Sequence, residues 1–194
     1  MYSLLLDSSN ILLAVGIAKD DKLIDSISYE CWQRQSEYMI KEIDNILKKN
    51  DVNPKNIDEV IVTLGPGSFT GLRIALTIAK IFGVALNIKI HAISSLEILK
   101  DDDKPSICLM NARSNRSYIG VYKNKDVILE DTIFTNEEVL KYIDDHKEYS
   151  ICGDVEYLGL TKNYGNIFNN MLKIKNENNL VKDVLKLKAI YLKD

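Results

Sequence analysis

The residues whose types and spacing best suit a binding site lie between Gly65 and Arg73, in the run Gly-Pro-Gly-Ser-Phe-Thr-Gly-Leu-Arg. The first two glycines permit backbone angles or close approaches that a side chain would block, and the proline fixes one dihedral angle between them. Ser68 or Thr70 can cap a helix that follows, whose first amides would then form an anion site. A turn that only packs the strand against the helix is the alternative.

The spacing of reactive side chains gives little support for a catalytic site. The turn lacks the Gly-Lys-Ser/Thr of a Walker loop and the Gly-x-Ser-x-Gly of a nucleophile elbow. His91 and His146 are far apart in the sequence and are interpreted as ordinary surface or core residues. The paired acids fall in polar turns and are interpreted as solvated charge, not as an acid–base pair. Cys31, Cys108 and Cys152 match neither a disulfide framework nor a zinc motif, and we expect reduced, packed thiols.

Composition limits the class of protein. The 194 residues are 46% hydrophobic and 27% charged, enough for one large domain or two small lobes. A formal net charge of -3 offers no basic field for holding a polyanion, so direct binding of a nucleic acid by this chain alone is disfavoured. The N-terminus lacks the features of a signal peptide and no apolar run is predicted to span a membrane, so we expect a cytoplasmic protein.

Hydrophobic periodicity predicts the elements that position these residues. The first half reads as a three-strand meander followed by alternating helices and strands, an α/β order with a mixed sheet. The predicted elements are strands at 2–7, 12–18 and 23–29, a helix capped by Ser36 and running to Lys49, a turn of helix at Asn53-Pro54, a strand at 59–64, a helix at 71–86 ended by Asn87, a strand at 89–93, and a short helix from Ser94 to Lys100.

The acidic run at 101–103 predicts a boundary between a first lobe at 1–100 and a smaller second lobe at 101–194, whose C-terminal tail could return to the first. The second half is predicted to hold a hairpin at 106–112 and 117–122, a strand at 127–129, a helix with a capping box at Thr135 and Glu138, a strand at 149–152 and a helix at 180–187. The structure of the Asn-rich segment 163–179 stays open.

The central turn resembles the signature of the TsaB family, bacterial proteins needed to make threonylcarbamoyladenosine in tRNA. The matching residues are Gly65, Pro66, Gly67, Ser68, Phe69, Thr70, Gly71, Leu72 and Arg73. The resemblance extends from Leu4 to about Leu99, with weaker similarity at 111–122 and 190–193. It implies an actin-like, sugar-kinase-like ATPase (ASKHA) fold: two lobes with mixed sheets flanked by helices, the second lobe reduced. Composition alone would not choose this fold over other α/β arrangements.

Active members of that fold hold phosphates with an acidic residue followed by glycine-bearing backbone. Here Asp7-Ser8-Ser9-Asn10 has the acid without a glycine, and the candidate second loop, Gly153-Asp154, has a single glycine. Asp7 could orient a magnesium-bound water, but capping of the turn is the favoured interpretation. We therefore expect no ATP hydrolysis and no cofactor.

The resemblance also argues against a metal site. The catalytic relative TsaD carries two histidines four residues apart, a spacing that lets both reach one ion. Aligned on Leu96-Glu97, those positions here are Ser95 and Leu99, and leucine cannot bind metal. The chain also departs from the TsaB pattern, with Gln35 where the family often has histidine and Asn111 where an aspartate is usual.

What the resemblance implies is a non-catalytic partner of TsaD, forming a heterodimer that works with TsaE. TsaD would transfer threonylcarbamoyl to the adenosine beside the anticodon of tRNAs that read codons starting with A, and this chain would contact tRNA only indirectly. Family members associate through the helices that correspond to 36–49 and 71–86. The predicted interface residues are Met39, Ile40, Ile43, Ile46, Leu47, Arg73, Leu76, Thr77 and Lys80.

Three other interpretations stay open. The helix at 71–86 is apolar nearly all round, so it has more than one face to bury, and the chain's own lobes could cover both. An actin-like-fold small-molecule kinase or ATPase, and a glycoprotease-like metallopeptidase, are the alternative functions. A homodimer is compatible with the partner role, because an exposed two-helix seam can pair with its own copy.

Overall fold

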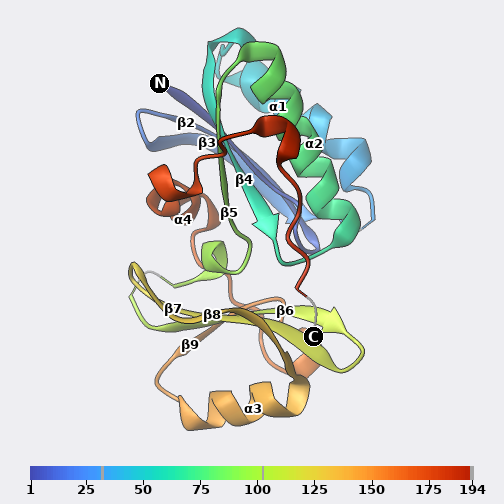
Figure 1. The fold of residues 1–194 in the computed structure, drawn as a ribbon, viewed down its shortest axis with the longest axis vertical. Helices are drawn as coiled ribbons and strands as arrows, with labels where there is room; N and C mark the ends of the chain where they lie inside the picture. The colour runs from blue at the N-terminus through green and yellow to red at the C-terminus, as the bar shows by residue number, and fades with distance from the viewer. Residues whose placement is uncertain (32, 102, 193–194) are drawn as a thin grey trace.

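The computed structural model describes residues 1–31, 33–101 and 103–192. Two separate β-sheets, one in each half of the chain, lie one above the other along the long axis of the molecule (Figure 1). Asp102, in the acidic run at the expected boundary, and Lys193, in the weakest stretch of similarity, lie outside the described residues. The division at residue 100 therefore stays a prediction, although the sheets themselves are distinct.

The first sheet has the order β3-β2-β1-β4-β5. Its strands are β1 (Tyr2–Asp7), β2 (Leu12–Lys19), β3 (Lys22–Glu30), β4 (Ile57–Gly65) and β5 (Lys89–Ser94). The first three form the predicted antiparallel meander, and β4 and β5 continue from β1 in parallel. Alternation along β1 divides its leucines between the two faces: Leu4 and Leu6 join one core, and Leu5 joins the other.

Two long helices cover one face of this sheet (Figure 1). Helix α1 (Gln35–Lys49) turns Met39, Ile43, Ile46 and Leu47 inward. Arg34 precedes the helix without a side-chain cap, so the cap predicted at Ser36 is wrong. Helix α2 (Phe69–Leu86) begins at the predicted cap, where the Ser68 hydroxyl accepts a hydrogen bond from the amide of Gly71 at 3.2 Å. Asn87 ends α2 in the left-handed conformation, as predicted.

The opposite face of the first sheet packs against elements from both halves of the chain. These are the turn η2 (Glu97–Leu99) and helix α4 (Ile167–Ile174), which lies inside the Asn-rich segment whose structure was left open. Asn170 is fully buried, and its amide donates to the carbonyls of Ile98 and Lys100 at 2.9 and 2.8 Å. This core also takes Cys108 and Met110 from the second sheet, so it joins the two lobes.

The second sheet has the order β8-β7-β6-β9. Its elements are β6 (Ser106–Arg113), β7 (Arg116–Lys123), β8 (Asp126–Thr135), α3 (Asn136–Asp145) and β9 (Ser150–Gly153). The predicted hairpin is confirmed, β8 is longer than predicted, and the Thr135–Glu138 capping box starts α3 as expected. Helix α3 covers the face that is turned away from the first lobe (Figure 1).

The C-terminal segment returns to the first lobe as an extended strap. The helix predicted at 180–187 is wrong: only the single turn η5 (Val184–Lys186) forms there. The amide of Val181 donates to the carbonyl of Ile90 at 2.9 Å, and that of Ile190 to Leu64 at 2.8 Å. These backbone bonds to β5 and β4, one on each side of η5, hold the strap beside α2 (Figure 1).

Two further expectations can be compared with the structure. Cys31, Cys108 and Cys152 are free and buried, as predicted. Helix α2, by contrast, is long and apolar enough by composition to cross a membrane, with 18 residues and a mean hydropathy of 1.6, although no such run was expected. It packs on β4, β1 and β5 and against α1, and 39% of its residues are buried.

Candidate functional site

The glycines of the central turn are required by close backbone approaches. A Cβ on Gly65 would lie 2.4 Å from the carbonyl oxygen of Ile190, in the C-terminal strap. A Cβ on Gly71 would lie 1.8 Å from the carbonyl oxygen of Ser8, and one on Gly67 would lie 2.2 Å from that of Ser9. Gly65 and Gly67 also have φ values of +127° and +153°. The turn therefore joins the β1–β2 turn on one side to the strap on the other; its Gly65–Pro66 peptide is cis.

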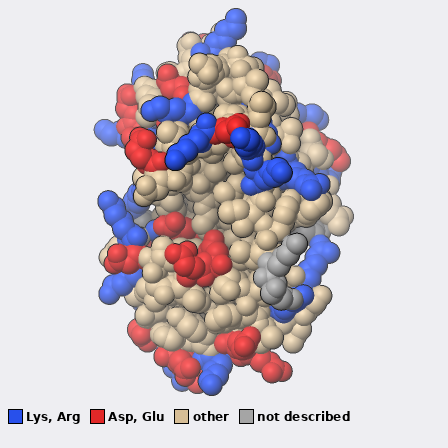
Figure 2. Space-filling model, viewed as in Figure 1, with Lys and Arg blue, Asp and Glu red and all other residues tan. Residues whose placement is uncertain are grey.

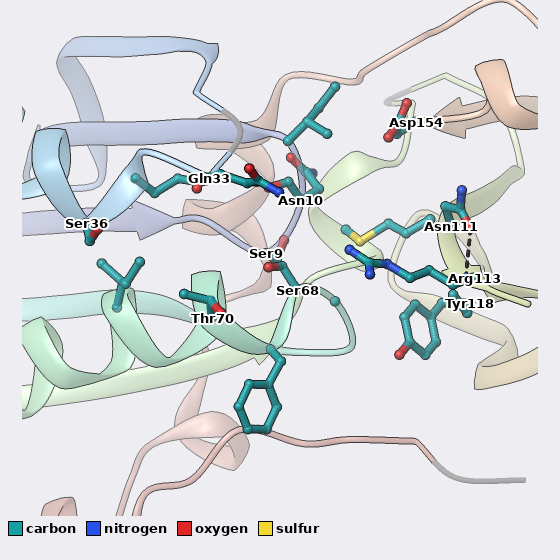
Figure 3. Close-up of a pocket in the computed structure, with 17 residues that line it drawn as sticks. Ser9, Asn10, Gln33, Ser36, Ser68, Thr70, Asn111, Arg113, Tyr118 and Asp154 are labelled. Atoms are coloured by element: carbon teal, nitrogen blue, oxygen red, sulfur yellow. Dashed lines mark hydrogen bonds between the residues drawn. The ribbon is translucent and has the colours of Figure 1, made fainter.

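A cleft of about 770 Å³ opens between the lobes at the start of α2 (Figure 3). Its first-lobe wall includes Ser9 and Asn10 from the β1–β2 turn and Ser68 and Thr70 from the start of α2. The second lobe contributes residues from the ends of β6, β7 and β9 on the opposite wall: Met110, Asn111, Ala112, Arg113, Tyr118 and Asp154. The volume is in the range of small-molecule sites.

Several polar groups beneath this cleft have no partner among the described residues. Asp7 is fully buried, and its Oδ1 accepts from the Thr63 hydroxyl at 2.6 Å and from the Ser9 amide at 3.0 Å. Its Oδ2, the hydroxyl of Ser9 and the Nδ2 of Asn10 make no hydrogen bond. Burial raises the pKa of Asp7 in spite of the bonds from Thr63 and Ser9. Asp7 therefore caps the turn, as the sequence favoured, and its Oδ2 makes no hydrogen bond with the described residues.

The opposite wall carries one basic and one acidic side chain. Arg113 is exposed on the turn between β6 and β7, and Figure 3 shows its guanidinium extending toward the Ser9 and Ser68 side of the cleft. Asp154 follows β9 and Gly153, whose Cβ would lie 2.1 Å from the carbonyl oxygen of Leu109. Burial raises the pKa of the Asp154 carboxyl. Gly153 therefore serves a close contact between strands, which is a structural reason for a glycine there.

The positions that correspond to metal ligands in the catalytic relative are buried in the core. Ser95 and Leu99 are both fully covered, and His91 lies on the neighbouring strand with its ring nitrogens committed to other groups. His146 stacks on Tyr142 at 4.2 Å between ring centroids, at the end of α3 in the other lobe. Within the described residues, no three or more His, Cys, Asp or Glu side chains gather where a metal ion could bind.

His91 belongs to a buried ionic cluster that the sequence analysis missed. Glu59 accepts hydrogen bonds from Ser3 at 2.6 Å and Lys175 at 2.7 Å, and its other oxygen lies 3.5 Å from the His91 Nε2. Burial raises the pKa of Glu59, but these bonds outweigh it and lower the pKa to about 2. Lys175 also pairs with Asp21, so the cluster ties the end of α4 to the first sheet. The partners are distant in sequence, so no local pattern could have revealed it.

The predicted interface residues fall into two groups. Five are covered by the chain's own core and contribute to an interface only indirectly: Met39, Ile43, Ile46, Leu47 and Leu76. Ile40, Arg73 and Thr77 are exposed and Lys80 is half-buried. Arg73 stacks on the Phe69 ring at 3.7 Å, and the interface itself stays a prediction.

Sequence reasoning overlooked other apolar side chains on the outer surface of α2 and the strap. Ile81 and Val84 are each 59% exposed, and Leu185 of the adjoining turn η5 is 75% exposed. Spacing of three and four residues along α2 could have identified the first two. Figure 2 shows charged side chains of both signs scattered over the face that carries the strap, with uncharged surface between them.

The two stacked mixed sheets, their flanking helices and the cleft between them define the class of protein: an actin-like, sugar-kinase-like ATPase fold with a reduced second lobe. The solved structure of YeaZ from Pseudomonas aeruginosa matches with a TM-score of 0.80 at 17% identity, covering 98% of this chain and 99% of that one. A second structure, of an uncharacterized protein with similarity to peptidase YeaZ, also matches at 0.80. At this identity, these similarities support the fold alone.

Sequence comparisons define the family. The model of TsaD, tRNA N6-adenosine threonylcarbamoyltransferase, matches residues 30–167. The chain is 31% identical over 137 residues to the tRNA threonylcarbamoyladenosine biosynthesis protein TsaB of Bacillus subtilis, a match covering 69% of this chain and 60% of that protein. It is also 28% identical over its whole length to an uncharacterized protein of Mycoplasma genitalium, covering 95% of it. The chain belongs to the TsaB family and carries a TsaD-type domain.

Proposed function

We propose that this chain acts in threonylcarbamoyladenosine biosynthesis as a partner subunit of the threonylcarbamoyltransferase TsaD, together with TsaE, in the cytoplasm. The name of its Bacillus relative supports a role in threonylcarbamoyladenosine biosynthesis. The match to the TsaD model supports a common ancestor of this chain and TsaD. In this role residues 1–100 form the lobe that carries the interface, and residues 101–194 form the smaller lobe, with its tail fastened to the first.

The observation that carries the partner role is the outer surface of α1, α2 and the strap. This surface keeps Ile40, Ile81, Val84 and Leu185 exposed after the chain's own sheets have covered the inner faces of the helices. Burying such side chains against a partner is favourable by about 25 cal/mol per Å² of apolar area. The proposed interface therefore omits the predicted residues that the chain's own core covers, and it adds Ile81 and Val84 near the C-terminal end of α2.

We further propose that the chain does not catalyse the transfer or hydrolyse ATP. The turn Asp7–Asn10 packs directly against α2, with the carbonyl oxygens of Ser8 and Ser9 in contact with Gly71 and Gly67. Glycine-bearing backbone that could wrap a triphosphate is missing from this turn. Calorimetric titration of the purified chain with ATP and Mg²⁺ is expected to show no binding; measurable turnover of ATP would overturn this part of the proposal.

Co-expression with TsaD from the same organism, followed by size-exclusion chromatography, tests the partner role. The wild-type chain is expected to elute with TsaD, and Ile81→Glu to elute separately, because the change places a charge in the proposed interface. Ile128→Glu, at a 44% exposed isoleucine on β8 of the other lobe, is the matched control and should still co-elute. Separate elution of the wild-type chain, or equal effects of the two variants, would contradict the proposal.

A further inference from the structure

On α2 and the strap (residues 180–192), basic residues outnumber acidic ones five to one. The basic residues are Arg73, Lys80, Lys182, Lys186 and Lys188, and the acidic residue is Asp183. The two elements lie side by side: the Lys80 ammonium donates to the carbonyl of Leu185 at 3.4 Å, and the Nε of Arg73 donates to the Tyr191 hydroxyl at 3.2 Å. Because the whole chain has a net charge of -3, this surface is a local exception in the sign of its charge.

The lysines of the strap are turned to solvent. Leu187 is buried in the core of the first lobe, and Lys186 and Lys188 on either side of it are exposed, as is Lys182. Asp183 pairs with Lys186 at 3.2 Å, but no carboxylate of the described residues forms an ion pair with Lys182 or Lys188. Blue side chains follow the strap across the upper half of Figure 2, with a red one among them. The strap therefore presents positive charge that the described residues leave uncompensated.

Two exposed aromatic rings lie at one end of this basic surface. Phe69 is 55% exposed and Tyr191 is 38% exposed, and their ring centroids are 5.1 Å apart. The guanidinium of Arg73 lies 3.7 Å from the centroid of the Phe69 ring. Aromatic rings and arginine planes that are open to solvent stack on unpaired bases, and such stacking tolerates many sequences. Basic side chains beside exposed rings are the combination with which proteins bind single-stranded nucleic acid.

We propose that the strap and the start of α2 form an RNA-binding surface, in which the lysines contact backbone phosphates and Phe69 and Tyr191 stack on an unpaired base. That the RNA is a tRNA rests on the proposed function in threonylcarbamoyladenosine biosynthesis. The net charge of the chain argues against a nucleic acid only as an average over the whole molecule, whereas a phosphate backbone meets a local surface. This surface adjoins Leu185 of the proposed TsaD interface, so a tRNA bound here would lie beside the transferase.

Fluorescence anisotropy of the purified full-length chain with a labelled anticodon stem-loop RNA, at several salt concentrations, tests the class of partner. The stem-loop is expected to bind more tightly than a fully paired stem of the same length, because only the loop offers unpaired bases. The logarithm of the binding constant should fall linearly with the logarithm of the salt concentration, since counterions are released from the phosphates. Polyglutamate should compete poorly, because it carries charge without bases. No binding of the stem-loop, equal binding of the paired stem, or full competition by polyglutamate would overturn the proposal.

Variants test the location. Lys182→Gln combined with Lys188→Gln should reduce the steepness of the salt dependence by about two, one for each lost phosphate contact. Lys123→Gln combined with Lys125→Gln removes the same charge from exposed positions beside the turn between β7 and β8, and should bind like the wild type. Phe69→Leu should weaken binding of the stem-loop by roughly tenfold and leave binding of the paired stem unchanged. Equal effects of the two double variants, or unchanged binding by Phe69→Leu, would refute the surface.

The partner role and the RNA surface can fail separately. Lys182→Gln combined with Lys188→Gln is expected to elute with TsaD in the co-expression experiment, because neither lysine is among the apolar side chains of the proposed interface. Co-elution of the wild-type chain with TsaD, without RNA binding by the purified chain, would overturn the RNA surface alone. RNA binding without co-elution would overturn the partner role alone.

Discussion

Replacing Glu59 by Gln should destabilise the fold, because Glu59 lies at the centre of the buried cluster. It is 2% exposed and accepts hydrogen bonds from Ser3 and Lys175, and His91 approaches its second oxygen. The amide of Gln can keep one acceptor but has no charge for Lys175 or His91. Since Lys175 ends α4, the variant also loosens the link between the second half of the chain and the first sheet.

The magnitude follows from the pKa of Glu59, which the cluster lowers from 4.5 to about 2. At about 1.4 kcal/mol per unit, this shift corresponds to roughly 3 kcal/mol of stability. Because the folded state has the lower pKa, the contribution is fully present above about pH 4.5 and is lost as the pH falls toward 2. Burial lowers the pKa of His91, but its hydrogen bonds to Glu59 and Asn179 outweigh burial and raise that pKa. The stability that depends on protonated His91 is therefore lost as the pH rises through the raised pKa.

Urea unfolding of the wild type and of Glu59→Gln between pH 3 and pH 7 measures this contribution. The difference in unfolding free energy should be roughly 3 kcal/mol at pH 7 and should shrink steadily below pH 4.5. Glu37→Gln is the control: its ion pair with Arg34 is exposed and should contribute less than about 1 kcal/mol. A difference at pH 7 no larger than that of the control, or one that does not change with pH, would refute the reasoning.

Three further outcomes are expected. Gly71→Ala should destabilise the chain by several kcal/mol, about the scale of severe core changes, because its Cβ would meet the Ser8 carbonyl at 1.8 Å; a stability gain of about 1 kcal/mol, as helix propensity alone predicts, would show that the β1–β2 turn can move. Thr135→Ala should cost about 1 kcal/mol in thermal or urea unfolding, whereas Thr135→Ser should be close to wild type; equal losses would mean that the cap hydroxyl contributes nothing. The three buried cysteines should react with a thiol reagent only on unfolding, since burial also raises the pKa of Cys108, and rapid reaction of the native chain would contradict their placement.

Local patterns in the sequence were sufficient for several elements in both lobes. The meander, the Ser68 cap, the Asn87 helix end and the Thr135–Glu138 capping box depend on residues a few positions apart, and the structure has all of them. The central turn was also predictable, since its glycines mark close approaches of the backbone. What it approaches, the carbonyl of Ser8 and the strap at Ile190, could not be predicted, because those partners are far away along the chain.

Tertiary structure alone decided the rest. An apolar stripe states that a helix face is buried but not by what, so Met39 and Leu76 were read as interface residues although the first sheet covers them. The segment 180–187 has apolar residues at helical spacing, yet backbone bonds from Val181 to β5 and from Ile190 to β4 fix the chain on both sides of it, and only the turn η5 forms. The cleft likewise exists only because folding brings Ser9 and Arg113 together from different lobes. Sequence determines interactions whose partners are neighbours in the chain, whereas contacts between distant segments depend on the free energy of the whole packed fold.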